Sequence, residues 1–265
     1  MMNKRIVSGV MIFTISTSMI TIISTGIWLL NQPSDLCLGD KSAQYDGRGE
    51  FTSIIYVGAG LCLMFTVVCL FAMPVRPSWR KYGEYGDQRM IIAVTCFGVQ
   101  LLLLILFASL YALTQSTVGF VALQRWIYSP ERWINIKDCL YEDSNVCARF
   151  QNKYGDDTQH QFFGRYLTPL ESGCCKPPIE CNFKFSSPSV WIKPSNGTYS
   201  NTDCYEWEND QKKLCYNCQV CKLGYTLELK NAWTISGTVV VIAWLVFLSG
   251  FILPKMLVKD QDELM

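Results

Sequence analysis

Four long stretches of the chain are predominantly apolar and carry no charged side chain. They cover residues 6–30, 52–73, 90–113 and 233–253, and each is 21 to 25 residues long. A helix of about 20 apolar residues crosses the roughly 30 Å hydrocarbon core of a bilayer. Each stretch is therefore predicted to form a transmembrane helix, and we expect Pro254 to end the fourth one.

The first apolar stretch has a second interpretation. Small residues near its end, Ser24, Thr25 and Gly26, resemble the cleavage site of a signal peptide, but the uncharged run is long for one. Thr17, Thr21 and Thr25 recur every four residues and give one helix face small hydroxyl groups. Either this face lets a neighbouring helix approach closely in lipid, or the hydroxyls bond within their own helix.

The segments between the spans differ in their basic residues, and basic residues in short loops mark the cytoplasmic side of a membrane. Two basic residues precede the first span, four lie in residues 74–89, and two lie in residues 31–51. We therefore predict that residues 1–5, 74–89 and 254–265 are cytoplasmic. Residues 31–51 and 114–232 are predicted to form a small and a large extracellular loop.

Charge and composition narrow the classes of function. The 265 residues carry a formal net charge of +1, which gives no support for nucleic-acid binding. The single histidine, His160, leaves little for a zinc site or a general base and is interpreted as a solvated loop residue. Gln100 is the strongly polar residue of the third span, and no span holds the charges typical of ion paths. We predict no enzyme, no metal site and no cofactor.

Ten of the thirteen cysteines fall in the two predicted extracellular segments, and Cys62, Cys69 and Cys96 fall inside spans. An oxidising compartment favours disulfide bonds between such closely spaced cysteines. The large segment holds nine of the ten, so either Cys37 joins its network or one thiol stays free. The sequence does not determine the connectivity. The disulfide candidates are Cys37, Cys139, Cys147, Cys174, Cys175, Cys181, Cys204, Cys215, Cys218 and Cys221.

Two of these cysteines, Cys174 and Cys175, are adjacent in the chain. A disulfide requires Cα atoms several ångströms apart with converging Cβ vectors, so neighbouring cysteines do not easily bridge each other. They are predicted instead to tie two separate parts of the chain to one point. Gly173 before them is expected to permit backbone angles that a larger residue resists, and Pro177-Pro178 after them stiffens the chain.

The segment from Cys215 through Cys218 to Cys221 allows three interpretations. Closely spaced cysteines bind zinc, but here the two spacings share Cys218 and no histidine lies nearby. A redox-active Cys218–Cys221 pair would need a setting that stabilises the thiolate, such as a helix N-terminus. We favour the third interpretation, in which all three cysteines form structural disulfides.

The rest of the large loop carries weaker signals. Residues 120–150 have a helix-like apolar rhythm, the chain from Gly155 onward is rich in loop residues, and residues 223–231 are expected to run as a helix into the fourth span. Asn196-Gly-Thr is an acceptor sequence for N-glycosylation. The loop-like stretch around it, residues 182–202, is predicted to face partner proteins.

These features together resemble the plant branch of the tetraspanin family. That branch is marked by a Gly-Cys-Cys-Lys/Arg-Pro motif in the large loop of a four-span protein, where animal tetraspanins carry Cys-Cys-Gly. The resemblance covers essentially the whole chain and is most specific over residues 139–222. The matching residues are Gly173, Cys174, Cys175, Lys176 and Pro177, flanked by Cys139, Cys147, Cys181, the Asp203-Cys204-Tyr-Glu-Trp207 run, and Cys215, Cys218, Cys221 and Lys222.

The resemblance implies an all-α membrane protein, a four-transmembrane-helix bundle with a disulfide-rich, mainly helical large extracellular domain. It implies a multi-pass glycoprotein of the plasma membrane with both termini cytoplasmic. Such a protein is a non-enzymatic scaffold that gathers other membrane proteins, tetraspanins and lipids into lateral assemblies, as homo- or hetero-oligomers. In plants the resemblance points to cell communication and the regulation of cell differentiation.

The chain also departs from the family pattern. Span one lacks the family's Asn, span four lacks its Glu or Gln, and the cytoplasmic loops lack juxtamembrane cysteines for palmitoylation. Cys69 and Cys96, near the inner face, are candidates for that role or simply pack inside the spans. Two alternative functions stay open: a membrane thiol-disulfide oxidoreductase that uses Cys218–Cys221, and a junctional channel of the connexin or claudin type.

Overall fold

The computed structural model describes residues 4–38, 116–195 and 197–263, together with Val99, Leu102, Leu103 and Leu106. The predicted second span, the loop 74–89 and most of the third span lie outside the described residues. So do Cys62, Cys69, Cys96, Gln100 and Asn196. The chain divides into two compact units. The described part of one, here called the apolar unit, is residues 4–29 and 234–263 with the four single residues just named. The described part of the other, the disulfide-rich unit, is residues 30–38, 116–195 and 197–233.

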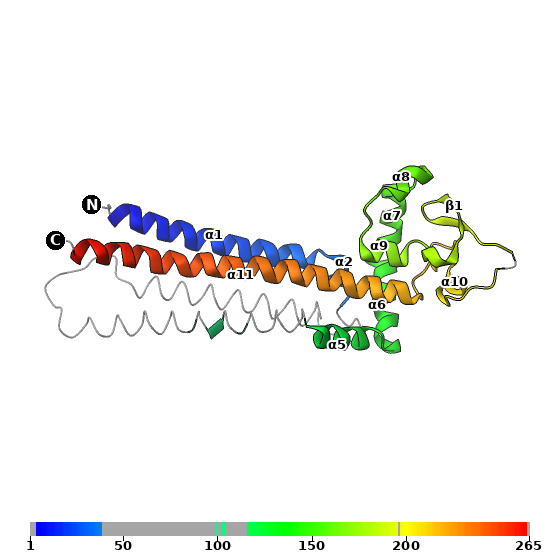
Figure 1. The fold of residues 1–265 in the computed structure, drawn as a ribbon, viewed down its shortest axis with the longest axis horizontal. Coiled ribbons are helices and arrows are strands. Elements are labelled where there is room, and N and C mark those ends of the chain that lie inside the picture. Colours follow the sequence, from blue (N-terminus) through cyan, green and yellow to red (C-terminus); the bar gives the residue numbers. More distant parts are fainter. Residues whose placement is uncertain are drawn as a thin grey trace. The chain divides into compact units, whose positions relative to one another are not determined.

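Two long helices carry the described part of the apolar unit. Helix α1 (Lys4–Leu30) covers the first predicted span, and α11 (Gln219–Glu263) begins in the disulfide-rich unit and continues through the fourth predicted span (Figure 1). Among the described residues one helix, Gln219–Phe247, is long and apolar enough to cross a membrane. The described structure is thus mostly helical, with a helix suited to a bilayer.

The hydroxyl groups of the threonine face of α1 form hydrogen bonds within the helix. The Thr17 hydroxyl donates a hydrogen bond to the Phe13 carbonyl oxygen at 2.9 Å, that of Thr21 to Thr17 at 2.9 Å, and that of Thr25 to Thr21 at 2.7 Å. These bonds satisfy the hydroxyls within their own helix. The second interpretation is therefore confirmed for these donors, and the close approach of a neighbouring helix stays a prediction.

The fourth predicted helix differs from the sequence-based expectation at its C-terminal end. The prediction that Pro254 ends it was wrong, because α11 continues to Glu263. Proline removes one N–H donor and crowds the carbonyl four residues earlier, yet a long apolar helix tolerates this when other groups satisfy that carbonyl. At the other end, the expected helix over residues 223–231 is confirmed and begins earlier, at Gln219.

Short helices dominate the disulfide-rich unit. The helical rhythm of residues 120–150 is confirmed, since three helices fill residues 117–154. From Gly155 onward the chain is less loop-like than expected, because further short helices and two strands follow. The elements are α2 (Pro33–Leu36), α5 (Thr117–Ile127), α6 (Pro130–Glu142), α7 (Val146–Tyr154), α8 (Gln159–Phe163), α9 (Pro169–Cys174), the 3-10 helix η1 (Ile179–Cys181), β1 (Lys184–Ser187), β2 (Val190–Ile192) and α10 (Asp203–Glu206).

Local capping groups explain where several of these helices begin. The Ser116 hydroxyl accepts the Gly119 N–H at 3.0 Å and starts α5. Thr168 and Glu171 form a capping box at the start of α9, in which each side chain binds the other residue's backbone N–H. Such caps supply partners for the N–H groups that a first helical turn leaves unpaired.

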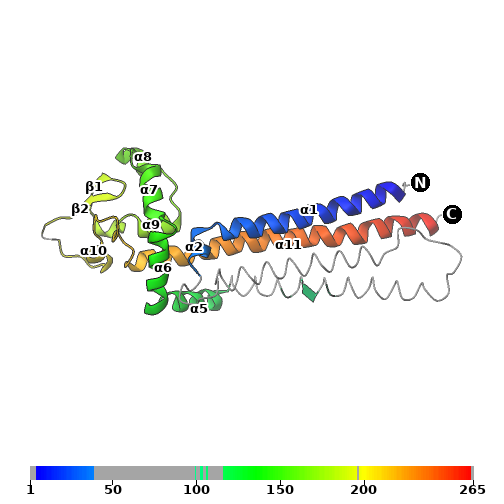
Figure 2. The ribbon, with the colours of Figure 1, turned by 180° about the vertical axis from the view of Figure 1, so that it is seen from behind.

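Residues 182–202, expected to be loop-like, contain a β-hairpin instead. Strands β1 and β2 pair antiparallel, with Phe185 opposite Trp191, and lie side by side in Figure 2. The side-chain amide of Asn209 completes the free edge of β2: it accepts the Trp191 N–H at 2.9 Å and donates to the Trp191 carbonyl at 3.0 Å. Both inward-facing rings pack on Phe162 of α8, so the hairpin rests on an aromatic core.

Candidate functional site

The structure joins the ten disulfide candidates in five bonds. Cys37 is bonded to Cys139, so the small predicted loop is linked to the large segment, and neither of these two thiols is free. All ten cysteine side chains are buried. The bonds are Cys37–Cys139, Cys147–Cys175, Cys174–Cys221, Cys181–Cys204 and Cys215–Cys218.

The adjacent cysteines Cys174 and Cys175 have different partners. Cys174 at the end of α9 is bonded to Cys221 in the first turn of α11, and Cys175 is bonded to Cys147 of α7. The closed loops span 47 and 28 residues. By the chain-entropy estimate, closing loops of this size stabilises a fold by about 4 kcal/mol each. This pair of residues therefore fixes three helices at one point, which we call the cysteine hub (Cys147, Cys174, Cys175 and Cys221).

Close packing of α9 on α11 explains the glycine before the hub. A Cβ on Gly173 would lie 2.4 Å from the Val220 carbonyl oxygen, and one on Gly224 would lie 2.3 Å from the Pro169 carbonyl oxygen. The expectation that Gly173 serves unusual backbone angles was wrong, because it lies within a regular helix. Its role is steric, and Gly224 has the reciprocal role on α11. The sequence signal for Gly224 was an isolated glycine inside a helical segment.

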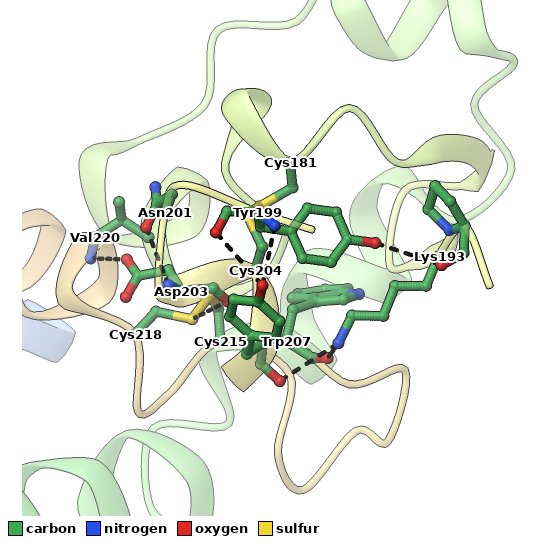
Figure 3. The surroundings of a disulfide bond; sticks show 12 residues. Cys181, Lys193, Tyr199, Asn201, Asp203, Cys204, Trp207, Cys215, Cys218 and Val220 are labelled. Carbon is green, nitrogen blue, oxygen red and sulfur yellow. Dashed lines mark hydrogen bonds between the residues drawn. A yellow bond between two sulfur atoms is a disulfide. The ribbon is translucent and has the colours of Figure 1, made fainter. Parts of the chain in front are cut away.

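A buried carboxylate holds the start of α11. Asp203, 3% exposed, accepts the backbone N–H groups of Gln219 at 2.8 Å and Val220 at 2.9 Å (Figure 3). These are charge-assisted bonds at the positive end of a long helix, where a negative side chain is most favourable. Cys204 beside it is bonded to Cys181, which ties the helix that carries this carboxylate, α10, to η1. Sequence reasoning missed this cap because 16 residues separate acceptor and donor.

A lysine fastens the hairpin to the segment that carries this cap. The Lys193 ammonium, just beyond β2, donates to the Trp207 carbonyl at 2.9 Å and to the Tyr205 carbonyl at 3.3 Å. Figure 3 shows its chain reaching across to Trp207. Lys193 also lies 5.7 Å from the centre of the Phe183 ring, a cation–π distance. The hairpin and the cysteine hub thus belong to one connected structure.

Two side chains near the hub have shifted proton affinities. Burial lowers the pKa of the Lys176 amine, and the nearby Glu180 carboxylate partly opposes this shift. Burial raises the pKa of the Tyr216 phenol to about 12. The basic residue of the Gly173–Pro177 motif is therefore a half-buried group, unlike an ordinary surface lysine.

The described residues give a redox site little support. Cys218 is bonded to Cys215, and Cys221 to Cys174, so the Cys218–Cys221 pair required by the oxidoreductase alternative does not form. The reason is geometric: Cys221 lies in the first turn of α11 and faces α9, whereas Cys218 precedes that helix. Within the described part of the chain, no three His, Cys, Asp or Glu side chains form a group that could hold a metal ion. His160 is exposed on α8.

The outer face of the hairpin exposes apolar side chains within the segment chosen from the sequence. Val190 is 38% exposed and Ile192 53% exposed, and both lie on the face opposite the buried Trp191. Apolar side chains in such positions are typical of interaction sites when they lie together. The predicted glycosylation site, Asn196, follows four residues after Ile192 in the sequence and lies outside the described residues.

The described structure is that of a mostly helical protein with a disulfide-rich unit and a helix of membrane-crossing length. Tetraspanin-8 of Arabidopsis thaliana is 40% identical to the chain over 126 residues, which are 48% of this chain and 45% of that protein. Tetraspanin-2 of the same plant is 39% identical over 128 residues, 46% of each chain. Protein TORNADO 2, also from Arabidopsis thaliana, is 37% identical over 111 residues, 42% of this chain and 40% of that protein.

Two of these relatives are plant tetraspanins by name, and together the three support the assignment of this chain to the plant tetraspanin family. The similarity spans slightly less than half the length of the curated relatives it matches. No protein-family model matches the chain, and no solved structure does.

Proposed function

We propose that this chain is a non-enzymatic scaffold of the plant plasma membrane that gathers partner membrane proteins and other tetraspanins into lateral assemblies. The proposal includes a role in cell communication and in the regulation of cell differentiation. The observation that supports it best is the cysteine hub, which holds α7, α9 and α11 at one point. A disulfide-rich unit fixed by covalent bonds suits the recognition of partner proteins, because it loses little conformational entropy when it binds them.

The proposed topology has four spans, at residues 6–30, 52–73, 90–113 and 233–253, with both termini cytoplasmic. Residues 31–51 and 114–232 face the outside, where disulfides persist. The buried disulfides of the disulfide-rich unit and the membrane-crossing length of Gln219–Phe247 support this arrangement. Gln100 belongs to the third span, Asn196 carries a glycan, and Cys69 and Cys96 are the candidates for palmitoylation.

The proposed partner surface is residues 182–202, and the outer face of the hairpin lies at its centre. Val190 and Ile192 expose apolar area that the hairpin itself does not cover. The hydrogen bonds of Lys193 and Asn209 tie the hairpin to residues 207–209 and restrain the backbone beneath this face. Apolar contacts on a rigid element are the arrangement expected of a protein-binding surface.

Proximity labelling in plant cells tests this proposal. A biotin ligase is fused to the cytoplasmic C-terminus of the full chain, and the double substitution Val190→Ser, Ile192→Ser is compared with the unchanged chain. We expect the variant to reach the cell surface in equal amount and to lose labelling of specific membrane partners. The control is Ile134→Ser, at a residue that is 53% exposed on α6. Equal partner labelling by the hairpin variant and the unchanged chain would contradict the assigned surface.

A further inference from the structure

Helix α5 has apolar side chains on two opposite faces. Leu123 and Ile127 pack into the core of the disulfide-rich unit. On the other face, Val118 is 73% exposed and Val121 48% exposed, and Ala122 beside them is exposed too. Positions 118, 121, 122 and 125 fall on one side of a helix. The outer face is therefore apolar over its first two turns and becomes charged at Arg125, which is also exposed.

Two contacts show that α5 runs antiparallel to the start of α11. The Lys230 ammonium lies 5.0 Å from the centre of the Phe120 ring, and that of Lys222 lies 5.8 Å from the centre of the Tyr128 ring. Moving eight residues forward along α5 thus corresponds to moving eight residues backward along α11. Positions on α5 can therefore be read as heights along α11.

This register places the apolar end of α5 beside the start of the fourth predicted span. Lys230 precedes that start, Trp233, by three residues, which is about 4.5 Å along a helix. By this register Val118 and Val121 lie level with residues 232 and 229 of α11, whereas Arg125 lies level with residue 225, roughly 8 Å further from Trp233. The lipid headgroup region adds about 5–8 Å beyond the hydrocarbon on each side of a bilayer. The change from valine to arginine thus occurs over the thickness of that region.

From these observations we infer that the outer face of the first two turns of α5, formed by Val118, Val121 and Ala122, is covered by the lipids of the outer leaflet. The inference rests on the span positions of the proposed function. A lipid boundary explains why exposed polarity changes along the helix axis, with a basic side chain at the height of the phosphates. A docked protein would favour a patch surrounded by polar residues on all sides. The disulfide-rich unit is therefore seated on the membrane surface by α5.

Photo-crosslinking of the full chain in phosphatidylcholine nanodiscs tests this contact. A benzophenone amino acid replaces Val118, Val121, Ile134 or Ile242, one at a time, and mass spectrometry measures the lipid adduct formed on illumination. Non-reducing gels verify that each variant keeps its disulfides. We expect adducts at Val118 and Val121 to exceed those at Ile134 severalfold, because Ile134 is 53% exposed on α6 among charged neighbours.

Ile242 is 56% exposed and lies within the fourth predicted span. Crosslinking at this position distinguishes failure of the inference about α5 from failure of the proposed topology. If Ile242 forms lipid adducts while Val118 and Val121 form none, or crosslink to a second copy of the chain, the inference about α5 is wrong and the span stands. If Ile242 forms no lipid adduct, the proposed topology fails first, and the inference fails with it.

Discussion

At the scale of single residues, the packing of the disulfide-rich unit depends on how closely the backbones of two helices approach each other. Gly173 and Gly224 each face a carbonyl oxygen of the other helix, and a Cβ added at either glycine would lie too close to that oxygen. The Cα atoms of Cys174 and Cys221, each in one of these helices, lie 4.4 Å apart. The disulfide and the two glycines therefore serve one contact, between α9 and α11.

Gly173→Ala tests this contact. Its Cβ would lie 2.4 Å from the Val220 carbonyl oxygen, so the helices must separate, and we expect the variant to lose about 1–3 kcal/mol of unfolding free energy. The measurement is thermal unfolding of the full chain in nanodiscs, followed by tryptophan fluorescence. The matched control is Gly164→Ala, where the nearest atom to a new Cβ is 3.5 Å away. Equal unfolding temperatures for both variants would refute the steric explanation.

The buried phenol of Tyr216 predicts a dependence of stability on pH. Burial raises its pKa from 10.0 to about 12, so the folded state favours the neutral phenol. The resulting stabilisation is complete below pH about 10 and is lost as the pH rises toward about 12, and it amounts to about 2 kcal/mol. Tyr216→Phe should remove this dependence.

A rapid pH jump with detection of phenolate absorbance measures the pKa of this group. The difference between the unchanged chain and Tyr216→Phe isolates one tyrosine from the rest. A group that ionises near pH 10 in this difference spectrum would show that Tyr216 is solvated. The rapid jump limits the time that disulfides spend at high pH.

At the scale of elements, long-range contacts determine where α11 begins and how it is held. Asp203 lies in a separate short helix, α10, and accepts hydrogen bonds from two N–H groups in the first turn of α11. Cys221 fixes the same turn to α9. The longest helix of the described structure, with 45 residues, is thus anchored at its N-terminal end by side chains from elsewhere in the chain.

Asp203→Ala is expected to loosen this end of α11. It removes two charge-assisted bonds and leaves two partly buried N–H groups without the carboxylate, which costs about 1–3 kcal/mol. Hydrogen exchange at the amides of Gln219 and Val220 should accelerate strongly. Asp210→Ala is the control, because its carboxylate accepts an N–H in an exposed turn. Unchanged exchange at residues 219 and 220 would show that the cap is dispensable.

The disulfides should differ in how much they stabilise the disulfide-rich unit. Removing Cys147–Cys175 by a double substitution to serine opens a loop of 28 residues, whereas removing Cys215–Cys218 opens one of 3. The chain-entropy estimate gives losses of about 4 and about 2 kcal/mol. All four cysteines are buried, so the loss of apolar contact is similar.

Thermal unfolding of the two double variants in nanodiscs compares these losses directly. The Cys147–Cys175 variant should unfold at the lower temperature and reach the cell surface in smaller amount. If removing Cys215–Cys218 lowered the unfolding temperature more, loop length would not determine the stabilisation. That bond would then stabilise the start of α11 directly.

At the scale of the whole molecule, orientation in the membrane is the property that the proposed function depends on most. The disulfide-rich unit holds five disulfides among its described residues, and these bonds require an oxidising compartment. The proposed topology therefore predicts a glycan at Asn196 and none in the loop 74–89.

Glycosylation mapping in plant cells measures this orientation. The unchanged chain should show a mobility shift when its N-glycans are removed by an endoglycosidase, and Asn196→Gln should abolish that shift. An acceptor sequence inserted into residues 74–89 of the Asn196→Gln chain should stay unmodified. A glycan on the inserted site would reverse the topology, and with it the proposed partner surface.

Much of the fold followed from local sequence. Helices over residues 117–154 were predictable because apolar spacing, the Ser116 cap and Pro130 act within one or two turns. The hairpin was missed because its strands are only 4 and 3 residues long, and Ser and Pro around them also favour loops. The continuation of α11 past Pro254 was missed because proline was weighed as a local signal.

The sequence by itself determined that Cys174 and Cys175 must have different partners, since adjacent residues do not easily bridge each other. It also determined which stretches are apolar enough to span a bilayer. Only the tertiary structure decided that those partners are Cys221 and Cys147, that Gly173 is needed for a close helix contact, and that Asp203 caps α11. These choices depend on backbones that meet across 16 to 47 residues of sequence, and local conformational preferences do not encode such meetings.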